Sequence, residues 1–475
     1  MRRLFRRKGE ITVFLALILS TVLGLLCVIF ESARIQFIKL EKEIGMDAAL
    51  RSCFGEYHKE LYEKYDLLYI DTAYRVAQAN IENTQRHLRT YMEENMDSGH
   101  SKAAADLLGT TVTNTTIEEY LLGSDYGGLP TYSQAVEYLK KYGDISHIPQ
   151  IENIRNQLPY FDSEGVLGNW DEALSRVHSF NVSFINPAEE IRGMAAQGAK
   201  QTVTARSFRQ SGLPYRDVPS VRQLKKGNYS LPSVNENESV FTEYLLQKCG
   251  SYPNSYSDSV LSCELEYLIY GKSKDMDNAT AVADRLIRIF AKENLEYLSA
   301  DASRQSEMED LAERIVPYPV FDPLCPEAWF DRELLKEAVV DSLECAWAQT
   351  EAILKTDRLL GGGRVSANEP SAEWILPLDV MTEYRTMMYQ SGGSGFGYQE
   401  YLSVFLRGIE REILTKRFLD IVEINMRNLG SPGFAADGCI EYMKARIDTN
   451  STFGHDYYIV RSYAYENRYR NSDIA

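Results

Sequence analysis

Residues 8–37 read KGEITVFLALILSTVLGLLCVIFESARIQF, and this stretch decides what kind of protein the chain encodes. Five of the first eight residues are basic, and no charged residue occurs from Ile11 to Phe30. An uncharged run of this length matches one crossing of a bilayer, for which a helix needs about 20 residues. The sequence therefore predicts a membrane-spanning helix directly after a short basic arm.

A cleaved signal peptide is the alternative interpretation of the same stretch. The apolar core of a signal peptide is usually about 7 to 15 residues long and leads into a small-x-small cleavage site. Here the run is longer, and Phe30-Glu31-Ser32-Ala33-Arg34 follows it. We therefore expect the segment to be retained as an anchor. Because positive charges stay in the cytoplasm, we expect the N-terminus inside and the bulk of the chain outside.

The composition predicts a folded, acidic protein. The chain has 475 residues, of which 44% are apolar, and it contains 31 Tyr and 18 Phe. This is enough material for two or three ordinary domains with cores of their own. The net charge is −17, and without the five cations of the arm it is −22. Such a surface repels phosphate backbones, so we expect no nucleic-acid partner.

Helical periodicity continues beyond the apolar run. Apolar residues recur at helical spacing between charged ones, at Leu40, Ile44, Ala48, Leu50, Phe54, Tyr57 and Leu61. The pattern predicts an amphipathic stalk to about residue 65, on the order of 80 Å for the whole helix, with bends at Gly45 and Gly55. Half of the stalk must pack on something outside the bilayer. The alternation in YDLLYID, residues 65–71, then predicts a strand.

The predicted fold class is α+β: an N-terminal transmembrane helix continues as an amphipathic stalk and carries a mixed, helix-rich extracytoplasmic head. The expected segments are a cytoplasmic arm (1–8), the anchor (9–30), the stalk (31–70), an α+β region (71–209), a loop or linker (210–259) and a helix-rich C-terminal region ending in a β-hairpin (260–475). The linker is assigned from its Pro, Asn, Ser and Gly content and its lack of periodicity.

Further elements are predicted inside the head. We expect helices over 73–97, 129–143, 278–298, 332–354 and 398–429, a β-rich stretch at 110–122, and the hairpin formed by CIEYMKARID and HDYYIVRSYAYE around TNSTFG.

Seven cysteines leave two alternatives open. Cys27 lies in the apolar run, so six remain beyond it, at positions 53, 249, 263, 325, 345 and 439. Six cysteines permit up to three disulfides, but buried unpaired thiols fit a chain of this size equally well. No pair has C-x-x-C spacing, which disfavours a zinc ribbon or a thioredoxin-type site.

The motifs that carry chemistry are incomplete. YGKS at 270–273 resembles the end of a phosphate-binding loop, but Glu266 occupies the position of its first Gly. GGSGFG at 392–397 lacks the third Gly of a dinucleotide-binding turn, because Tyr398 stands there. The six His residues occur singly, without ligand spacing. We therefore expect no catalytic, cofactor-binding or metal-binding residue and predict that the protein is not an enzyme.

Three stretches carry a resemblance to a known group. KGEITVFLALIL at 8–19, followed by ESARIQ at 31–36, resembles the start of the TadE/TadG-like proteins of tight-adherence (Flp) pilus loci, and especially an uncharacterised membrane family of Gram-positive bacteria. Residues 264–289 and 397–428 are similar to the C-terminal half of that family. The resemblance covers under a fifth of the chain. It implies a pilin-like plan, with other pilus or secretion-system membrane proteins as partners.

The resemblance also directs attention to three residues. Pilin-like precursors are cut after a Gly that is followed five positions later by Glu, which makes Gly9 a candidate processing site, but here that later position is Phe14. Glu31 and Arg34 flank the outer end of the anchor and are neighbours on a helix. They either mark the membrane edge or, as the pilin resemblance implies, Glu31 pairs with a neighbouring subunit and sets the register of helix packing.

Three functions follow from these patterns. The first is a pilin-like structural or assembly component of a tight-adherence pilus or a related secretion system. The second is a membrane-tethered adhesin or ligand-sensing module whose Tyr-rich head meets a surface ligand. The third is a tethered extracytoplasmic hydrolase, for which no motif was found.

Overall fold

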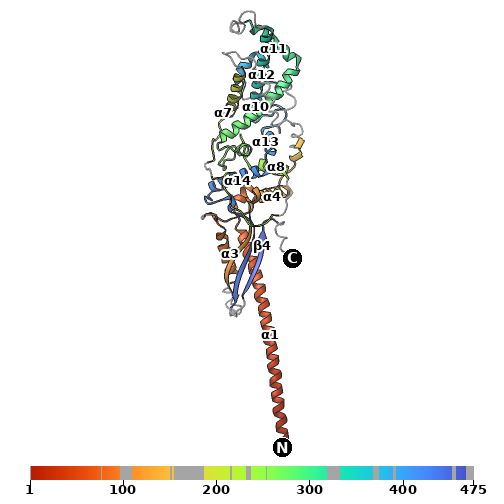
Figure 1. The fold of residues 1–475 in the computed structure, drawn as a ribbon, viewed down its shortest axis with the longest axis vertical. Coiled ribbons are helices and arrows are strands. Elements are labelled where there is room, and N and C mark those ends of the chain that lie inside the picture. Colours follow the sequence, from red (N-terminus) through yellow and green to blue (C-terminus); the bar gives the residue numbers. More distant parts are fainter. Residues whose placement is uncertain are drawn as a thin grey trace.

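The structure is a computed structural model that describes residues 2–75, 78–96, 110–149, 152–153, 187–213, 217–231, 237–252, 254–317, 332–366, 374–388, 392–451 and 456–466. It is elongated (Figure 1). The N-terminal helix α1 (Arg2–Gly55) projects as a rod from one end, a β-sheet lies where the rod enters the rest of the protein, and a group of helices forms the opposite end. We call everything after α1 the head.

Helix α1 confirms that the apolar segment continues into a stalk helix, but the predicted bend at Gly45 and the predicted end near residue 65 are wrong. The helix runs through Gly45 without interruption and ends at Gly55, and a separate helix α2 (Lys59–Tyr65) follows. Gly45 is buried against helix α3 (Ile81–Met96), where an added Cβ would lie 3.4 Å from the sulfur of Met92. Gly45 therefore lies in the contact between α1 and α3 and does not bend α1.

In the described part of the chain the sheet has four antiparallel strands, and the long strand β3 is the central one. Strand β3 (Cys439–Ser451) pairs with β2 (Thr110–Leu122) along one edge and with β4 (Tyr457–Ala464) and the two-residue β1 (Ile70–Asp71) along the other. The β-rich stretch and the C-terminal hairpin are thus confirmed. The predicted strand at 65–71 is wrong over most of its length, because α2 extends to Tyr65 and pairing begins only at Ile70.

One face of this sheet is covered by α1 and α3. The alternating side chains of β3 that point to this face, including Met443 and Ile447, pack with Leu50 and Phe54 of α1 and with Met92 of α3 in a single hydrophobic cluster. Antiparallel sheets commonly bury one face in this way. The unspecified packing partner of the stalk is therefore the protein's own sheet.

The helical part of the head has one continuous hydrophobic core. Its elements are α4 (Asp125–Tyr142), α7 (Pro187–Thr204), α8 (Glu238–Lys248), α9 (Glu264–Tyr270), α10 (Asp275–Ala300), α11 (Ala302–Ile315), α12 (Arg332–Leu360), the 3-10 segments η4 (Leu378–Met387) and η5 (Ala436–Gly438), α13 (Tyr398–Arg407) and α14 (Arg411–Asn428). Helices α10 and α12 pack along each other and α7 packs against both, at the end farthest from the N-terminus (Figure 1). Helices α3, α4, α10 and α12 correspond to predicted ones, whereas α7, α8, α9 and α11 were not predicted.

The single helix predicted for 398–429 is in fact two helices. Gly408 ends α13, Ile409 donates its backbone N–H to the carbonyl of Leu406 at 3.2 Å, and Glu410 has an extended conformation before α14 begins. The helical periodicity is the same on both sides of the break, so the pattern alone did not reveal it.

The stretch at 210–259 contains helix α8 and packs into the main core, so the expected long loop or linker is partly a structural element. Buried carboxylates accept hydrogen bonds from the backbone of the residues that follow α8. Glu264 accepts the N–H of Gly250 at 2.7 Å, and Asp275 accepts the N–H groups of Ser262 and Cys263 at 3.0 and 3.1 Å. Backbone donors without regular partners are thereby satisfied, which accounts for order in a segment without periodicity.

Candidate functional site

The apolar segment of α1 is the part of the molecule that most clearly points to a function. Within the described ranges, α1 is the one helix long and apolar enough to cross a membrane, and its residues from Ile11 to Phe30 are all exposed. Ser20 and Thr21 donate their hydroxyl protons to the carbonyl of Leu17 at 2.9 and 3.1 Å. Such bonds remove the cost of placing these hydroxyls in hydrocarbon.

Gly9 lies inside α1, in the turn before the apolar segment. Its status as a candidate processing site rests on sequence alone.

Glu31 and Arg34 form a two-pronged ion pair on α1. Arg34 donates from Nε to Oε2 of Glu31 at 3.0 Å and from Nη2 to Oε1 at 2.8 Å. The Arg34 side chain is 16% exposed, whereas that of Glu31 is 48% exposed. Glu31 is therefore the member of the pair that an approaching protein can reach.

Beyond the pair, α1 carries two apolar faces. Ile38, Met46 and Leu50 face the sheet and are buried. On the opposite side Phe30, Phe37, Leu40 and Ile44 are between 51 and 76% exposed, and Ala33 is also exposed. We call residues 30, 33, 37, 40 and 44 the open stripe. Their alternating spacing of three and four residues is that of the a and d positions of a coiled coil.

The face of α1 that is turned toward the sheet also contains a buried lysine. Lys42 is fully buried, its Nζ makes no hydrogen bond in the described structure, and it lies 4.8 Å from the ring centroid of Tyr457. Burial lowers the pKa of Lys42. The aromatic ring interacts favourably with the ammonium charge. This lysine therefore links α1 to the start of β4 and is inaccessible to solvent.

A Ser–His contact in the head resembles a nucleophile and its base but does not have that geometry. His58 caps α2, because its Nδ1 accepts the N–H of Leu61 at 3.2 Å. The neutral ring consequently carries its proton on Nε2, which lies 2.9 Å from Oγ of Ser431. In that tautomer the ring donates to Ser431 and cannot remove its proton. Both residues are buried, and burial lowers the pKa of His58.

The incomplete motifs have structural roles. Gly271 of YGKS adopts φ of 65° and ends helix α9, as expected for a glycine that stops a helix. In the GGSGFG stretch, Phe396 pairs with Val365 in an isolated β-bridge. Among the described residues, no group of three His, Cys, Asp or Glu side chains is arranged to hold a metal ion.

Six of the seven cysteines lie in the described ranges, and Cys325 falls outside them. Cys27, Cys53, Cys249, Cys263 and Cys439 are thiols and not halves of disulfides. Burial raises the pKa of the Cys53, Cys249, Cys263 and Cys439 thiols. The alternative of buried thiols therefore holds for these positions, and thiolate chemistry is suppressed there.

Taken together, the chain is a mixed α+β, helix-rich protein with a long apolar N-terminal helix that could span a membrane. It belongs to a family of unknown function, DUF5702, whose model matches residues 181–451. The match covers the head from before α7 to the end of β3 and leaves out α1. No curated protein and no solved structure matches the chain.

Proposed function

We propose that this protein is a non-enzymatic, single-pass membrane protein with an extracytoplasmic head, and that it acts as a pilin-like structural or assembly component of a tight-adherence (Flp) pilus or a related secretion system. The proposal rests on the resemblance of residues 8–19 and 31–36 to TadE/TadG-like proteins, on the basic arm before the span, and above all on the open stripe of α1.

The position of the open stripe supports a protein partner in preference to lipid. At 1.5 Å per residue, Phe37 lies roughly 10 Å and Ile44 roughly 20 Å beyond Phe30 along the helix. The headgroup layer adds only about 5 to 8 Å on each side of the hydrocarbon. If Phe30 marks the edge of the hydrocarbon, the bilayer covers the start of the stripe and leaves Phe37, Leu40 and Ile44 in water.

The opposite face of α1 is already occupied by the sheet, so the open stripe is presented in a fixed orientation. Membrane anchoring also forces neighbouring copies to be parallel, which is the arrangement in which a and d positions interlock. Side-by-side packing of α1 with other anchored helices would bury the stripe, and apolar burial is the main favourable term in such association.

Cysteine cross-linking in membranes tests this role. In a background with Cys27→Ala, which removes the exposed native thiol of α1, Phe37→Cys and Ile44→Cys should give cross-linked products with a second copy or with a pilus membrane protein. Lys39→Cys is the matched control, because Lys39 is exposed on α1 but lies off the stripe. Equal cross-linking at all three positions, or at none of them, would reject stripe packing.

A membrane-tethered adhesin or ligand-sensing module is the second candidate. The observation that favours it is a pocket in the head that is lined by several charged and amide side chains, is independent of α1 and is described next.

A further inference from the structure

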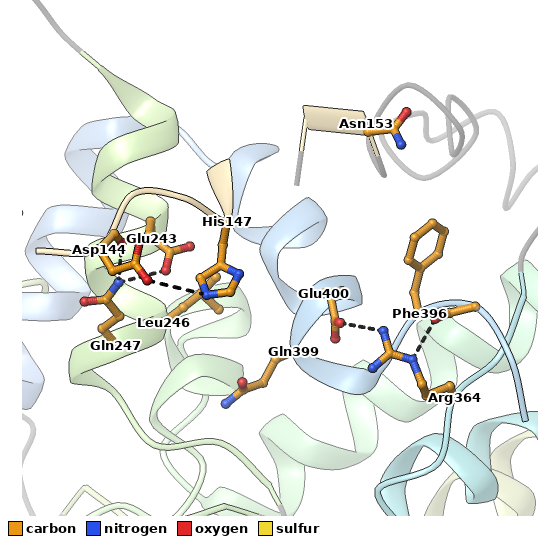
Figure 2. Close-up of a pocket in the computed structure, with 11 residues that line it drawn as sticks. Asp144, His147, Asn153, Glu243, Leu246, Gln247, Arg364, Phe396, Gln399 and Glu400 are labelled. Carbon is orange, nitrogen blue, oxygen red and sulfur yellow. Dashed lines mark hydrogen bonds and ion pairs between the residues drawn. The ribbon is translucent and has the colours of Figure 1, made fainter. Parts of the chain in front are cut away.

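A pocket of about 610 Å³ opens on the head between segments that are far apart in the sequence. One wall comes from the turn after α4 and from α8, and the other comes from the turn after α12, which carries Arg364, and from the start of α13 with the residues just before it. Asn153 also contributes to the lining. Figure 2 shows Asp144, His147 and Gln247 on one side of the space and Arg364 and Glu400 on the other. Its volume lies within the range of small-molecule sites, roughly 300–1,000 Å³.

The side chains on the first wall are held in place by one another. Gln247 donates from Nε2 to the carbonyl of Asp144 at 3.0 Å and to Oε1 of Glu243 at 2.8 Å. His147 stands next to them, with Nε2 3.9 Å from a carboxylate oxygen of Asp144. This wall therefore presents carboxylate and amide oxygens, and two hydrogen bonds hold the amide of Gln247 in place.

The opposite wall is organised by Arg364. Its Nη2 donates to Oε1 of Glu400 at 3.1 Å, and its Nε donates to the carbonyl of Gly395 at 2.8 Å. The ring of Phe396 lies beside this pair, and the exposed amide of Gln399 lies between the two walls (Figure 2). An apolar ring thus adjoins a row of hydrogen-bonding groups. Preorganised polar groups of this kind reduce the cost of ordering on binding.

The charge of the lining restricts the class of ligand. Asp144, Glu243 and Glu400 outnumber the guanidinium of Arg364, which is itself engaged with Glu400, so phosphates and other anions are disfavoured. Leu246 and Phe396 lie on opposite sides of the space with polar side chains between them (Figure 2), so they form no continuous apolar surface for a lipid chain. A neutral ligand rich in hydroxyl groups satisfies the lining best, because carboxylate and amide oxygens accept from hydroxyls and amide N–H groups donate to them, while the Phe396 ring offers a surface for the C–H face of a sugar.

We propose that this pocket binds a neutral or N-acetylated oligosaccharide. Binding is non-covalent, and no group in the pocket is assigned a chemical step. This proposal is independent of the proposed assembly role, because it concerns the head and not α1. Sugar binding and the cross-linking of α1 are measured in separate experiments. A sugar site on an anchored head would let the protein contact a glycan at a cell surface or in a wall.

The test uses the full-length protein in detergent micelles on an array of neutral, N-acetylated, sialylated and sulfated oligosaccharides, with oligolysine as a cationic probe. We expect binding to neutral or N-acetylated members. Gln399→Ala and Gln247→Ala should each weaken it about three- to tenfold, the equivalent of one or two hydrogen bonds. Gln210→Ala, at an exposed site outside the pocket, is the matched control and should bind like the wild type.

Thermal unfolding of each variant establishes that the head is intact; Gln399 is exposed, so its replacement leaves the core untouched. The proposal is overturned if the folded wild type binds no neutral or N-acetylated sugar, if sulfated or sialylated sugars or oligolysine bind in preference, or if binding persists unchanged in both pocket variants.

Discussion

Arg34 holds Glu31 through two hydrogen bonds on one face of α1, yet the two side chains differ in accessibility: Arg34 is mostly covered and Glu31 is half exposed. The pair lies at the outer end of the apolar run, one helical turn before the water-exposed part of the open stripe. An ion pair between neighbouring turns of one helix, with one half-exposed member, contributes little to the stability of a monomer. We therefore look for its effect in the association of α1 with other helices.

We predict that Glu31→Gln leaves membrane insertion unchanged but reduces cross-linking at Phe37→Cys severalfold. The reason is that a carboxylate between helices, in a low-dielectric environment, strongly stabilises the association when a charge on the neighbouring helix pairs with it. Arg34→Gln should do less harm, since Arg34 is the covered member. Membrane level by immunoblot and cross-linked fraction are the two measurements. Unaltered cross-linking in Glu31→Gln would mean that the pair only marks the membrane edge.

Protease digestion tests the proposed topology. Because five cations precede the span, we expect the head to lie outside the cell. Protease added to intact, wall-stripped cells should digest the head and leave a small membrane fragment that contains the arm. Complete protection of the head in intact cells, with digestion only after lysis, would reverse the orientation.

The N-terminal arm should remain attached. The Glu expected five positions after a processed Gly is Phe14 here, so cutting after Gly9 should be inefficient. Mass spectrometry of the membrane-extracted protein should find the basic residues at positions 2–8. A mature N-terminus at Glu10 would establish prepilin-type processing, and Phe14→Glu is the variant expected to increase such cutting.

Gly45 provides a test of how α1 packs on α3. A Cβ at this position meets the flexible side chains of Met92 and Met96, at ordinary contact distances. Gly45→Ala should therefore be tolerated and gain up to about 1 kcal/mol from helix propensity. Gly45→Leu overfills the contact and should cost about 1–3 kcal/mol. Denaturant unfolding in micelles measures both, and equal stability of the two variants would show that α3 does not approach α1 as described.

Glu266 should make the head less stable at alkaline pH. It is fully buried, its Oε1 accepts from the N–H of Tyr252 and the hydroxyl of Tyr398, and burial raises its pKa to about 8. An unfolded Glu titrates near 4.3, so between about pH 4 and pH 8 the folded state retains a proton that the unfolded state releases. The free energy of unfolding therefore falls as the pH rises through that interval.

Glu266→Gln removes this titration and keeps an acceptor oxygen for both donors. The variant should match the wild type near pH 5 and exceed it at pH 9 by an amount on the order of a few kcal/mol. Denaturant unfolding at pH 5, 7 and 9 measures the difference, with Glu296→Gln, an exposed site on α10, as the control. A difference that does not change with pH would show that Glu266 is ionised in the folded protein throughout.

Local patterns in the sequence were sufficient to predict several helices and strands. The uncharged run from Ile11 to Phe30, the helical spacing that continues toward Phe54 and the period-two alternation at 439–464 each reflect contacts that a residue makes with its near neighbours or with one apolar surface. For that reason the long N-terminal helix, the C-terminal hairpin and helices α10 and α12 were predicted from the sequence. The incomplete motifs were also recognised as such, because a missing Gly is a local property.

The remaining features depend on residues that are distant in the sequence. Periodicity showed that the stalk is amphipathic, but only the tertiary structure placed Met443 and Ile447 against one side of it and left Phe37 and Ile44 uncovered on the other. The break between α13 and α14 likewise arises from long-range packing and hydrogen bonding. So do the bonds of Gly250 and Ser262 to Glu264 and Asp275, and the meeting of Gln247 with Arg364 and Glu400 around one pocket. Such contacts leave no periodic signal, because each joins side chains whose spacing along the chain is set by the path of the fold and not by the geometry of a helix or strand.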